Sequence, residues 1–500
     1  MELVERSISA SQEAMTCGEF TAVELCQAYL DRIERMDRSG PTLRSVIEVN
    51  PEALSIASSL DLERAELGPR GPLHGIPILI KDNIDTGDLM ATTAGSLALE
   101  GHISSSDAFI VSRLRQAGAI ILGKTNLSEW ANFRSTRSCS GWSSRGGQVR
   151  NPYALDRSPC GSSSGSGVAA AASLAAAAVG TETDGSIVCP SGVNGLVGIK
   201  PTIGLVSRSG IIPISYSQDT AGPMARTVED AAILLTALAG QDSCDPITDN
   251  SFGKTIDFTS QLDINALRGT RLGVCRNFFG NHERVDEIID TALNQLKSLG
   301  AELVDPIDLG NIAMSTSAKH ELLLFEFKAG LNAYLAKHPN AKVRSLQEVI
   351  AFNETHADQV MPYFRQELHE LAQAKGDLAE HAYLEAKAEC LRVSRTDGID
   401  LALREHRLDA IVAPTNTPAW TVDLINGDRS LGSCSSPAAM AGYPHITVPA
   451  GYVEGLPVGI SFFSTAFTEG QLIGFAYAFE QATRVRRIPT YKTDVNKIAT

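Results

Sequence analysis

The sequence predicts an α/β fold built around one large sheet, and three observations predict it. Short apolar runs typical of buried strands alternate with longer helical patterns along most of the chain. The chain has 500 residues, of which 43% are hydrophobic and 20% charged, so it can bury a large core. It contains no internal repeat and no low-complexity tail. We therefore expect a layered arrangement of helices and strands.

The first half of the chain contains the most regular alternation. Its expected elements are helices within residues 1–70 (most clearly 19–36), a strand at 76–80, a helix at 108–117, a strand at 119–122, a buried helix at 168–178, a polar turn at 180–190, an apolar run at 196–199 and a helix at 228–238. The intervening residues 134–167 are rich in Ser, Gly and Arg and show little periodicity. A long irregular segment between apolar elements indicates a functional loop.

The second half begins with a polar stretch, 241–261, which we expect to be a surface linker. The elements expected after it are a strand at 271–275, a helix at 285–299, a strand at 301–304, a mostly helical region at 315–408, strands at 411–413, 445–449 and 458–463, and a closing helix at 471–483.

Charge and hydropathy exclude several classes of protein. The formal net charge is -15, and we find no run of five like charges, so we expect no nucleic-acid partner. The longest soft stretch, 168–179, is rich in alanine and too short to span a membrane. The N-terminus lacks the basic and apolar regions of a leader. We expect no membrane association and a cytoplasmic location.

The cysteines indicate reduced thiols. There are nine, an odd number, and no C-x-x-C pair occurs among them. A zinc cage or a disulfide framework would show paired spacing. Reduced cysteines in a reducing compartment are therefore expected.

Residues 156–200 carry the residues with catalytic potential. A turn containing Ser162 and Ser163 precedes an apolar small-residue segment, and a glycine turn ending at Ser186 follows that segment. Backbone N–H groups in such a turn can hold an oxyanion. A serine nucleophile needs a base, and no histidine lies near in sequence. Lys81 directly follows the apolar run 76–80, and burial would favour its neutral amine form.

Two other hypotheses compete for the same segment. Residues 161–165 fit G-x-S-x-G, with Ser163 as nucleophile and His445 as its base. Residues 165–170 fit the dinucleotide-binding pattern G-x-G-x-x-A, with Glu182 as the acid. Both patterns need a strand immediately before them, and Arg157 to Cys160 make a poor strand.

The segment closely resembles the amidase signature family, whose members hydrolyse amides with a Ser–cisSer–Lys triad. Further matching segments are 123–126 (GKTN), 195–202 (GLVGIKPT), 218–227 (QDTAGPMART), 441–444 (AGYP), 446–449 (ITVP) and 455–459 (GLPVG). The resemblance extends from about residue 20 to 485. It implies a single domain over 1–500, with a signature core at about 72–240 and a helical substrate-side region at about 315–408. It also implies one large mixed sheet covered by helices on both faces.

The resemblance assigns a role to individual residues. Ser186 corresponds to the nucleophile, Ser162 to the bridging serine and Lys81 to the lysine, and 24 residues separate the two serines as in the family. The expected oxyanion donors are the backbone N–H groups of Thr183, Asp184, Gly185 and Ser186. Ser163 and Asp219 are expected to hold the triad residues in position without belonging to the triad. No cofactor, metal or obligatory protein partner is implied, and Lys124, His74 and His445 are expected to be structural.

Two features depart from the usual family pattern. The family usually has Gly-Gly before the nucleophile, where this chain has Asp184-Gly185, and Asp where it has Glu182. In these features and in 158–166 (SPCGSSSGS) the chain is most similar to peptide amidases, bacterial enzymes that remove the C-terminal amide of peptides. A peptide amide is therefore the expected substrate. Candidates for lining the groove that binds it are Trp142, Phe325 and Trp420. The alternatives are a general or aryl acylamidase, a tRNA-linked glutamine amidotransferase subunit, and a non-catalytic amide-binding protein.

Overall fold

The computed structural model describes residues 2–495 except 252, 255–256 and 311–315. Its strands are β1 (Val46–Val49), β2 (Pro77–Lys81), β3 (Ile120–Thr125), β4 (Trp142–Ser143), β5 (Gly147–Gln148), β6 (Ala177–Glu182), β7 (Val197–Lys200), β8 (Thr220–Ala225), β9 (Arg271–Cys275), β10 (Glu302–Ile307), β11 (Ala410–Pro414), β12 (His445–Val453) and β13 (Leu456–Phe463). Eleven of them form one sheet in the order β1-β3-β2-β6-β8-β7-β12-β13-β11-β9-β10, while β4 and β5 pair separately. The sheet is mixed: β2 runs parallel to β3 and β6, and β8 runs antiparallel to β6 and β7.

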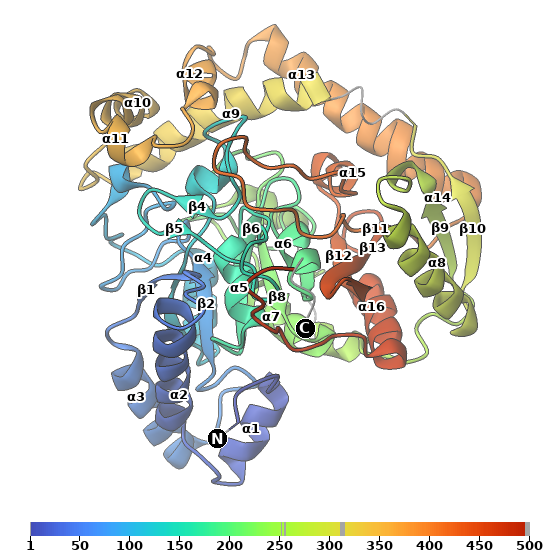
Figure 1. The fold of residues 1–500 in the computed structure, drawn as a ribbon, viewed down its shortest axis with the longest axis horizontal. Helices are drawn as coiled ribbons and strands as arrows, with labels where there is room; N and C mark the ends of the chain where they lie inside the picture. Colours follow the sequence, from blue (N-terminus) through green and yellow to red (C-terminus); the bar gives the residue numbers. More distant parts are fainter. Residues whose placement is uncertain (1, 252, 255–256, 311–315, 496–500) are drawn as a thin grey trace.

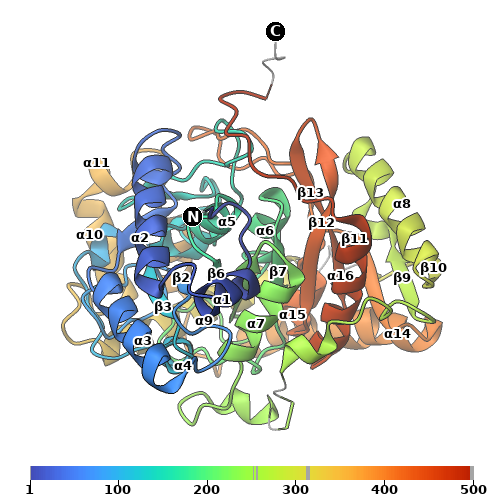
Figure 2. The same cartoon turned by 90° about the horizontal axis from the view of Figure 1, so that it is seen from below.

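Helices cover both faces of this sheet (Figures 1 and 2). They are α1 (Ile8–Thr16), α2 (Ala22–Ile33), α3 (Ala53–Leu67), α4 (Phe109–Gln116), α5 (Ser164–Ala171), α6 (Val188–Val193), α7 (Val228–Leu238), α8 (Glu283–Ser298), α9 (Thr316–Lys337), α10 (Leu346–Thr355), α11 (Ala357–Val360), α12 (Glu367–Gln373), α13 (His381–Leu391), α14 (Asp400–His406), α15 (Ser436–Ala441) and α16 (Glu469–Thr483). Helices α9 to α13 form an arch along the top of the view in Figure 1. The predicted α/β fold with one large mixed sheet is confirmed.

Burial on both faces explains the apolar strands, and side-chain caps explain where helices start. Every residue of β2 and β11 is buried, which is why both read as continuous apolar runs. Helix α2 begins after Thr21, whose hydroxyl accepts the Glu24 N–H while the Glu24 carboxylate accepts the Thr21 N–H. These local signals agree with the predicted order of elements.

The central alanine-rich segment corrects one prediction. Helix α5 ends at Ala171 and residues 177–182 form strand β6, so the helix predicted over 168–178 is wrong in its second half. Alanine favours helices, but residues 177–179 pair with β2 and 178–182 with β8. Pairing in the middle of the sheet overrides the local preference. The turn predicted at 180–190 accordingly begins only after β6.

Two more strands of the large sheet were not predicted, and the polar stretch 241–261 is anchored to the core. Strand β1 lies within the region expected to be helical, and β8 contains Gly222-Pro223, a pair that reads as a turn. Gly222 is needed there because a Cβ would lie 2.0 Å from the Ile199 carbonyl oxygen. Within 241–261 most of the described residues are exposed, as expected of a surface linker, while Asp242 and Phe258 are buried and anchor it to the core. Residues 252 and 255–256 of it lie outside the described residues, as does residue 315 of the predicted helical region.

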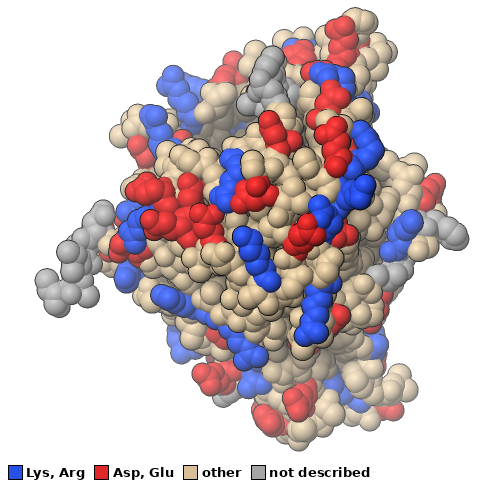
Figure 3. Space-filling model, turned by 90° about the vertical axis from the view of Figure 1, so that its right-hand side faces the viewer, with Lys and Arg blue, Asp and Glu red and all other residues tan. Residues whose placement is uncertain are grey.

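The surface carries both signs of charge. Figure 3 views the side on which α8 and α14 lie, where acidic and basic side chains are interspersed. Among the helices of the described residues, none has the length and apolarity required to cross a lipid bilayer.

Candidate active site

Lys81 is the last residue of a fully buried strand, and its amine contacts the turn that contains Ser162 and Ser163 (the serine turn). The side chain has no exposed area. Its Nζ lies 2.7 Å from Ser162 Oγ and 2.8 Å from Thr181 Oγ1. Burial lowers the pKa of the Lys81 amine to about 7, while the carboxylates of Asp219 and Glu182 act in the opposite direction. A neutral amine, able to accept a proton, is therefore accessible near neutral pH.

The serine turn is joined through its backbone to the turn that contains Ser186. The Gly161–Ser162 peptide bond is cis. The Ser163 N–H donates to the Ser186 carbonyl over 3.2 Å, so the two turns are in direct contact. The Ser163 hydroxyl donates to the Thr181 carbonyl and accepts the Thr181 N–H. Ser163 thus ties its turn to β6, and its hydroxyl is already engaged.

Exposure increases along the three proposed triad residues. Lys81 is fully buried, Ser162 is 1% exposed and Ser186 is 8% exposed. Ser186 follows β6 in a turn that contains Gly185 at φ +82° and that leads into α6. A molecule arriving from solvent therefore meets Ser186 before it meets the amine.

Glu182 is a residue whose contribution the sequence reasoning missed. Its buried carboxylate accepts the N–H groups of Gly185, Ile187 and Val188, at 2.9, 2.8 and 3.0 Å. Glu182 therefore helps to fix the backbone conformation of the turn around Ser186. The expectation that the Gly185 N–H is free to bind an oxyanion is corrected by this contact, because Glu182 already holds that donor.

The other predicted residues of this turn have polar partners of their own. The Thr183 hydroxyl donates to Asp219 Oδ1 over 2.6 Å, and Asp219 Oδ2 accepts the N–H groups of Ile214 and Ser215. Burial raises the pKa of Asp219 to about 6. Asp219 therefore braces the turn from the side of β8, through Thr183.

Asp184 connects the turn that contains Ser186 to the helical region 315–408. Lys319 Nζ, on α9, lies 2.7 Å from Asp184 Oδ2, and the hydroxyls of Ser435 and Ser436 donate to the same carboxylate. Lys319 and these hydroxyls lower the pKa of Asp184, although burial acts against them. Sequence reasoning missed Lys319, because nothing local marks which of the many lysines on helices faces the core.

A pocket opens beside this turn. Its lining residues are Asn83, Ala131, Thr181, Thr183, Arg208, Ile211, Ile212, Pro213, Ile214, Tyr216, Asp219 and Thr220. The three aromatic side chains expected in a groove are not among them. Trp142 and Phe325 are buried in packed clusters, and Trp420 packs beside Cys160 and Cys189.

The competing hypotheses do not fit the described geometry. No strand lies immediately before the turn that contains Ser163, as a nucleophile elbow or a dinucleotide motif would require. His445 is buried, and burial lowers its pKa to about 3. His74 is buried against the Leu60 carbonyl, and Lys124 Nζ donates to the Ile84 carbonyl, which confirms that both are structural.

A disulfide joins Cys160 to Cys189 across 29 residues. The expectation that all nine cysteines are reduced is therefore wrong. Cys160 directly precedes the Gly161–Ser162 peptide and Cys189 lies in α6, so the bond connects the two turns through contacts that sequence spacing does not reveal. Disulfides are typical of oxidising compartments, so the cysteines no longer support a cytoplasmic location.

Removing this disulfide is expected to destabilise the chain. By loop entropy, a cross-link closing a loop of this length contributes about 3–4 kcal/mol to the free energy of unfolding. The double variant Cys160→Ser/Cys189→Ser should therefore unfold at lower urea concentration than wild type, and reduced wild type should match it. Cys17→Ser, which removes an exposed free thiol, is the control. Equal urea midpoints for the double variant and this control would contradict the prediction.

Comparison with known proteins places these residues in a wider context. The sequence profile of the family described as Amidase matches residues 24–473. The native peptide amidase of Stenotrophomonas maltophilia is 53% identical, with a TM-score of 0.93, and the match covers 97% of this chain and 99% of that one. A probable amidase of Arabidopsis thaliana is 41% identical over 97% of this chain and 92% of its own length. A glutamyl-tRNA(Gln) amidotransferase subunit of Halorhodospira halophila is 35% identical, over 96% and 97% respectively.

Proposed function

This chain belongs to the amidase family, the amidase signature enzymes, and on that premise we propose that it hydrolyses the C-terminal amide of peptides with Ser186 as nucleophile. Membership makes the chain an amide hydrolase. The observation that carries the finer proposal is the buried Lys81 amine, 2.7 Å from Ser162 Oγ, with a pKa lowered to about 7. A solvated lysine would be protonated at neutral pH and could not act as a base.

The proposed reaction is acyl transfer in two steps. Neutral Lys81 takes a proton from Ser162 as Ser162 takes the proton of Ser186, and Ser186 Oγ attacks the amide carbon. The relay returns the proton to the departing nitrogen, which leaves as ammonia. Water, deprotonated by the same relay, then cleaves the acyl-enzyme to a free acid and restores Ser186.

The oxyanion is assigned to the nucleophile turn. With the Gly185 N–H engaged by Glu182, the remaining donors are the N–H groups of Thr183, Asp184 and Ser186. Donors held in place before the charge develops stabilise a tetrahedral intermediate without reorganisation. Glu182 and Asp219 are proposed to hold this turn in shape, and no cofactor or metal takes part in the proposed reaction.

Two observations favour a peptide amide as substrate. The similarity to the Stenotrophomonas maltophilia peptide amidase covers nearly the whole chain. The pocket beside the turn has an apolar wall at 211–214, next to the polar side chains of Thr183 and Asp219. We propose that the peptide lies along this wall under the helical region 315–408, which Lys319 links to Asp184.

A substrate panel tests the proposal on the purified chain alone, because we propose that it needs no partner protein. We expect kcat/KM for an N-acetylated dipeptide amide to exceed that for free glutamine, an anilide or a fatty amide by about 100-fold. The same dipeptide with a free C-terminal carboxylate should release nothing. Ammonia and amine release are measured directly. Preference for the anilide would favour an aryl acylamidase, and preference for glutamine would favour a component of an amidotransferase.

A further inference from the structure

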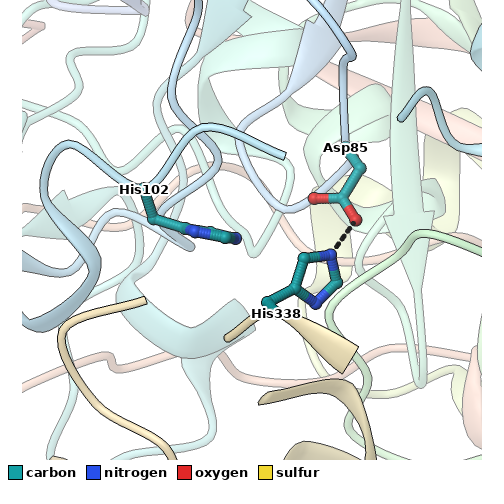
Figure 4. Close-up of side chains that lie close together, drawn as sticks. All are labelled: Asp85, His102 and His338. Carbon is teal, nitrogen blue, oxygen red and sulfur yellow. Dashed lines mark ion pairs between the residues drawn. The ribbon is translucent and has the colours of Figure 1, made fainter. Parts of the chain in front are cut away.

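Three metal-ligating side chains meet away from the serine turns. Asp85 lies in the loop after β2, His102 follows the short helical turn at 97–99, and His338 directly follows α9. One potential ligand atom from each lies within 4.8 Å of the others. Figure 4 shows His102 directed toward the Asp85–His338 pair. Three separate segments of the chain thus bring two imidazoles and a carboxylate to one place.

The hydrogen bonds of Asp85 and His338 leave one ligand atom of each pointing inward. His338 Nδ1 lies 2.8 Å from the Tyr334 carbonyl, so this nitrogen carries a proton, and in the neutral ring Nε2 holds the lone pair that can bind a metal. His338 Nε2 lies 3.2 Å from Asp85 Oδ2, while the Tyr334 hydroxyl donates to Asp85 Oδ1 over 2.7 Å. Outer hydrogen bonds that orient a histidine and a carboxylate in this way are typical of metal centres.

His102 supplies the independent observation. It is only 4% exposed, yet neither of its ring nitrogens has a hydrogen-bond partner within the described residues. Buried polar side chains are nearly always hydrogen-bonded, so an imidazole with two unpartnered nitrogens requires an explanation. Its ring stands edge-on to His338, with centroids 5.0 Å apart, and makes no contact that satisfies either nitrogen. An ion at this place would engage one of the two nitrogens.

The surroundings permit an ion to enter. The His338 side chain is 12% exposed, which opens the cluster to solvent. The nearby cation Lys124 directs its Nζ to the Ile84 carbonyl and the Thr92 hydroxyl, at 2.7 and 2.9 Å. The cluster therefore offers one lone-pair nitrogen from each neutral imidazole and a carboxylate oxygen from Asp85, once His338 is in the tautomer set by Tyr334.

We propose that Asp85, His102 and His338 bind one zinc ion. Two imidazole nitrogens and one carboxylate oxygen are a zinc ligand set that leaves a fourth position for water. Such an ion would clamp the end of α9 onto the loop that follows Lys81. It holds the helical region against the core and takes no part in the proton relay, so it is a structural site distinct from the serine turns.

Equilibrium dialysis against zinc chloride tests the site. The chain is prepared without a histidine tag and in a Cys17→Ser/Cys244→Ser background, which removes its exposed thiols. After chelator treatment we expect one equivalent of zinc to bind. His102→Ala should weaken binding by about 100-fold or more. His381→Ala removes an exposed histidine that pairs with Glu385, and it should bind zinc like the parent.

A second variant and a spectroscopic readout keep the outcome independent of folding and activity. Asp85→Asn retains the size of the side chain and should also weaken binding, with its circular dichroism unchanged. Cobalt substituted at the site should give a visible spectrum without thiolate charge transfer. Absence of stoichiometric binding, or equal affinity in the His102→Ala and His381→Ala variants, would overturn the proposal.

Discussion

Replacing Ser186 with alanine is expected to lower kcat for peptide-amide hydrolysis by about 10⁵-fold or more, because the acyl-enzyme can no longer form. The measurement is ammonia release under saturating substrate, with circular dichroism to confirm the fold. KM should change little, since the pocket beside the turn is lined by other residues and Ser186 is not among them. Ser186 is also the most exposed of the three proposed triad residues.

The control for this experiment lies on the next helix. Ser191 is a buried serine of α6 whose hydroxyl has no partner among the described residues. Ser191→Ala should keep most of the activity. Ser163→Ala tests the rejected elbow and should cost far less than Ser186→Ala, because its hydroxyl only joins two backbone segments. If Ser163→Ala abolished turnover while Ser186→Ala retained it, the nucleophile would be reassigned.

Replacing Lys81 with methionine is expected to lower kcat/KM by about 10³- to 10⁴-fold, the contribution of a positioned general base. In wild type, kcat/KM should rise with pH through about 7 and level off above it. The sign follows from the chemistry: below its pKa, Lys81 is protonated and cannot accept the proton of Ser162. In acid the rate should fall about tenfold for each pH unit.

The Lys81→Arg variant tests whether activity needs a base at this position or only a positive charge. Arginine keeps a cation at the end of β2 but does not deprotonate in proteins, so activity should not return at any pH. A flat profile between pH 5 and 9 in wild type would remove Lys81 as the titrating group. A loss smaller than tenfold in Lys81→Met would remove it as the base.

The fold could be predicted well wherever burial and local pattern agree. The strand before Lys81 was expected because residues 76–80 form an apolar run, and the structure buries all five positions. The alanine-rich segment was misjudged because its preference for helix is overridden by pairing within the sheet. Strand β8 contains a glycine and a proline, so its own sequence does not favour a strand. Pairing with the neighbouring strands β6 and β7 makes it one. The division into a signature core and a substrate-side helical region stays a prediction.

The site was predictable only in part for the same reason. The resemblance to the family selected Lys81 and the two serines as candidates, and the structure brings Lys81 to Ser162 and the Ser162 turn to the Ser186 turn. The roles of Glu182 and Lys319 depend on which way a side chain points, and no local pattern states that. In the Asp85–His102–His338 cluster, His338 lies more than 200 positions from the other two residues, a separation over which sequence periodicity carries no information.

The ion pair between Asp184 and Lys319 has a consequence for protein engineering. It couples the helical region mechanically to the turn that contains Ser186, in addition to the role we propose for that region in covering the substrate. Transplanting residues 315–408 from a relative with other preferences exchanges one end of that coupling while leaving the other in place. Positions 184 and 319 therefore have to be inherited as a pair in any chimaera that is to retain turnover.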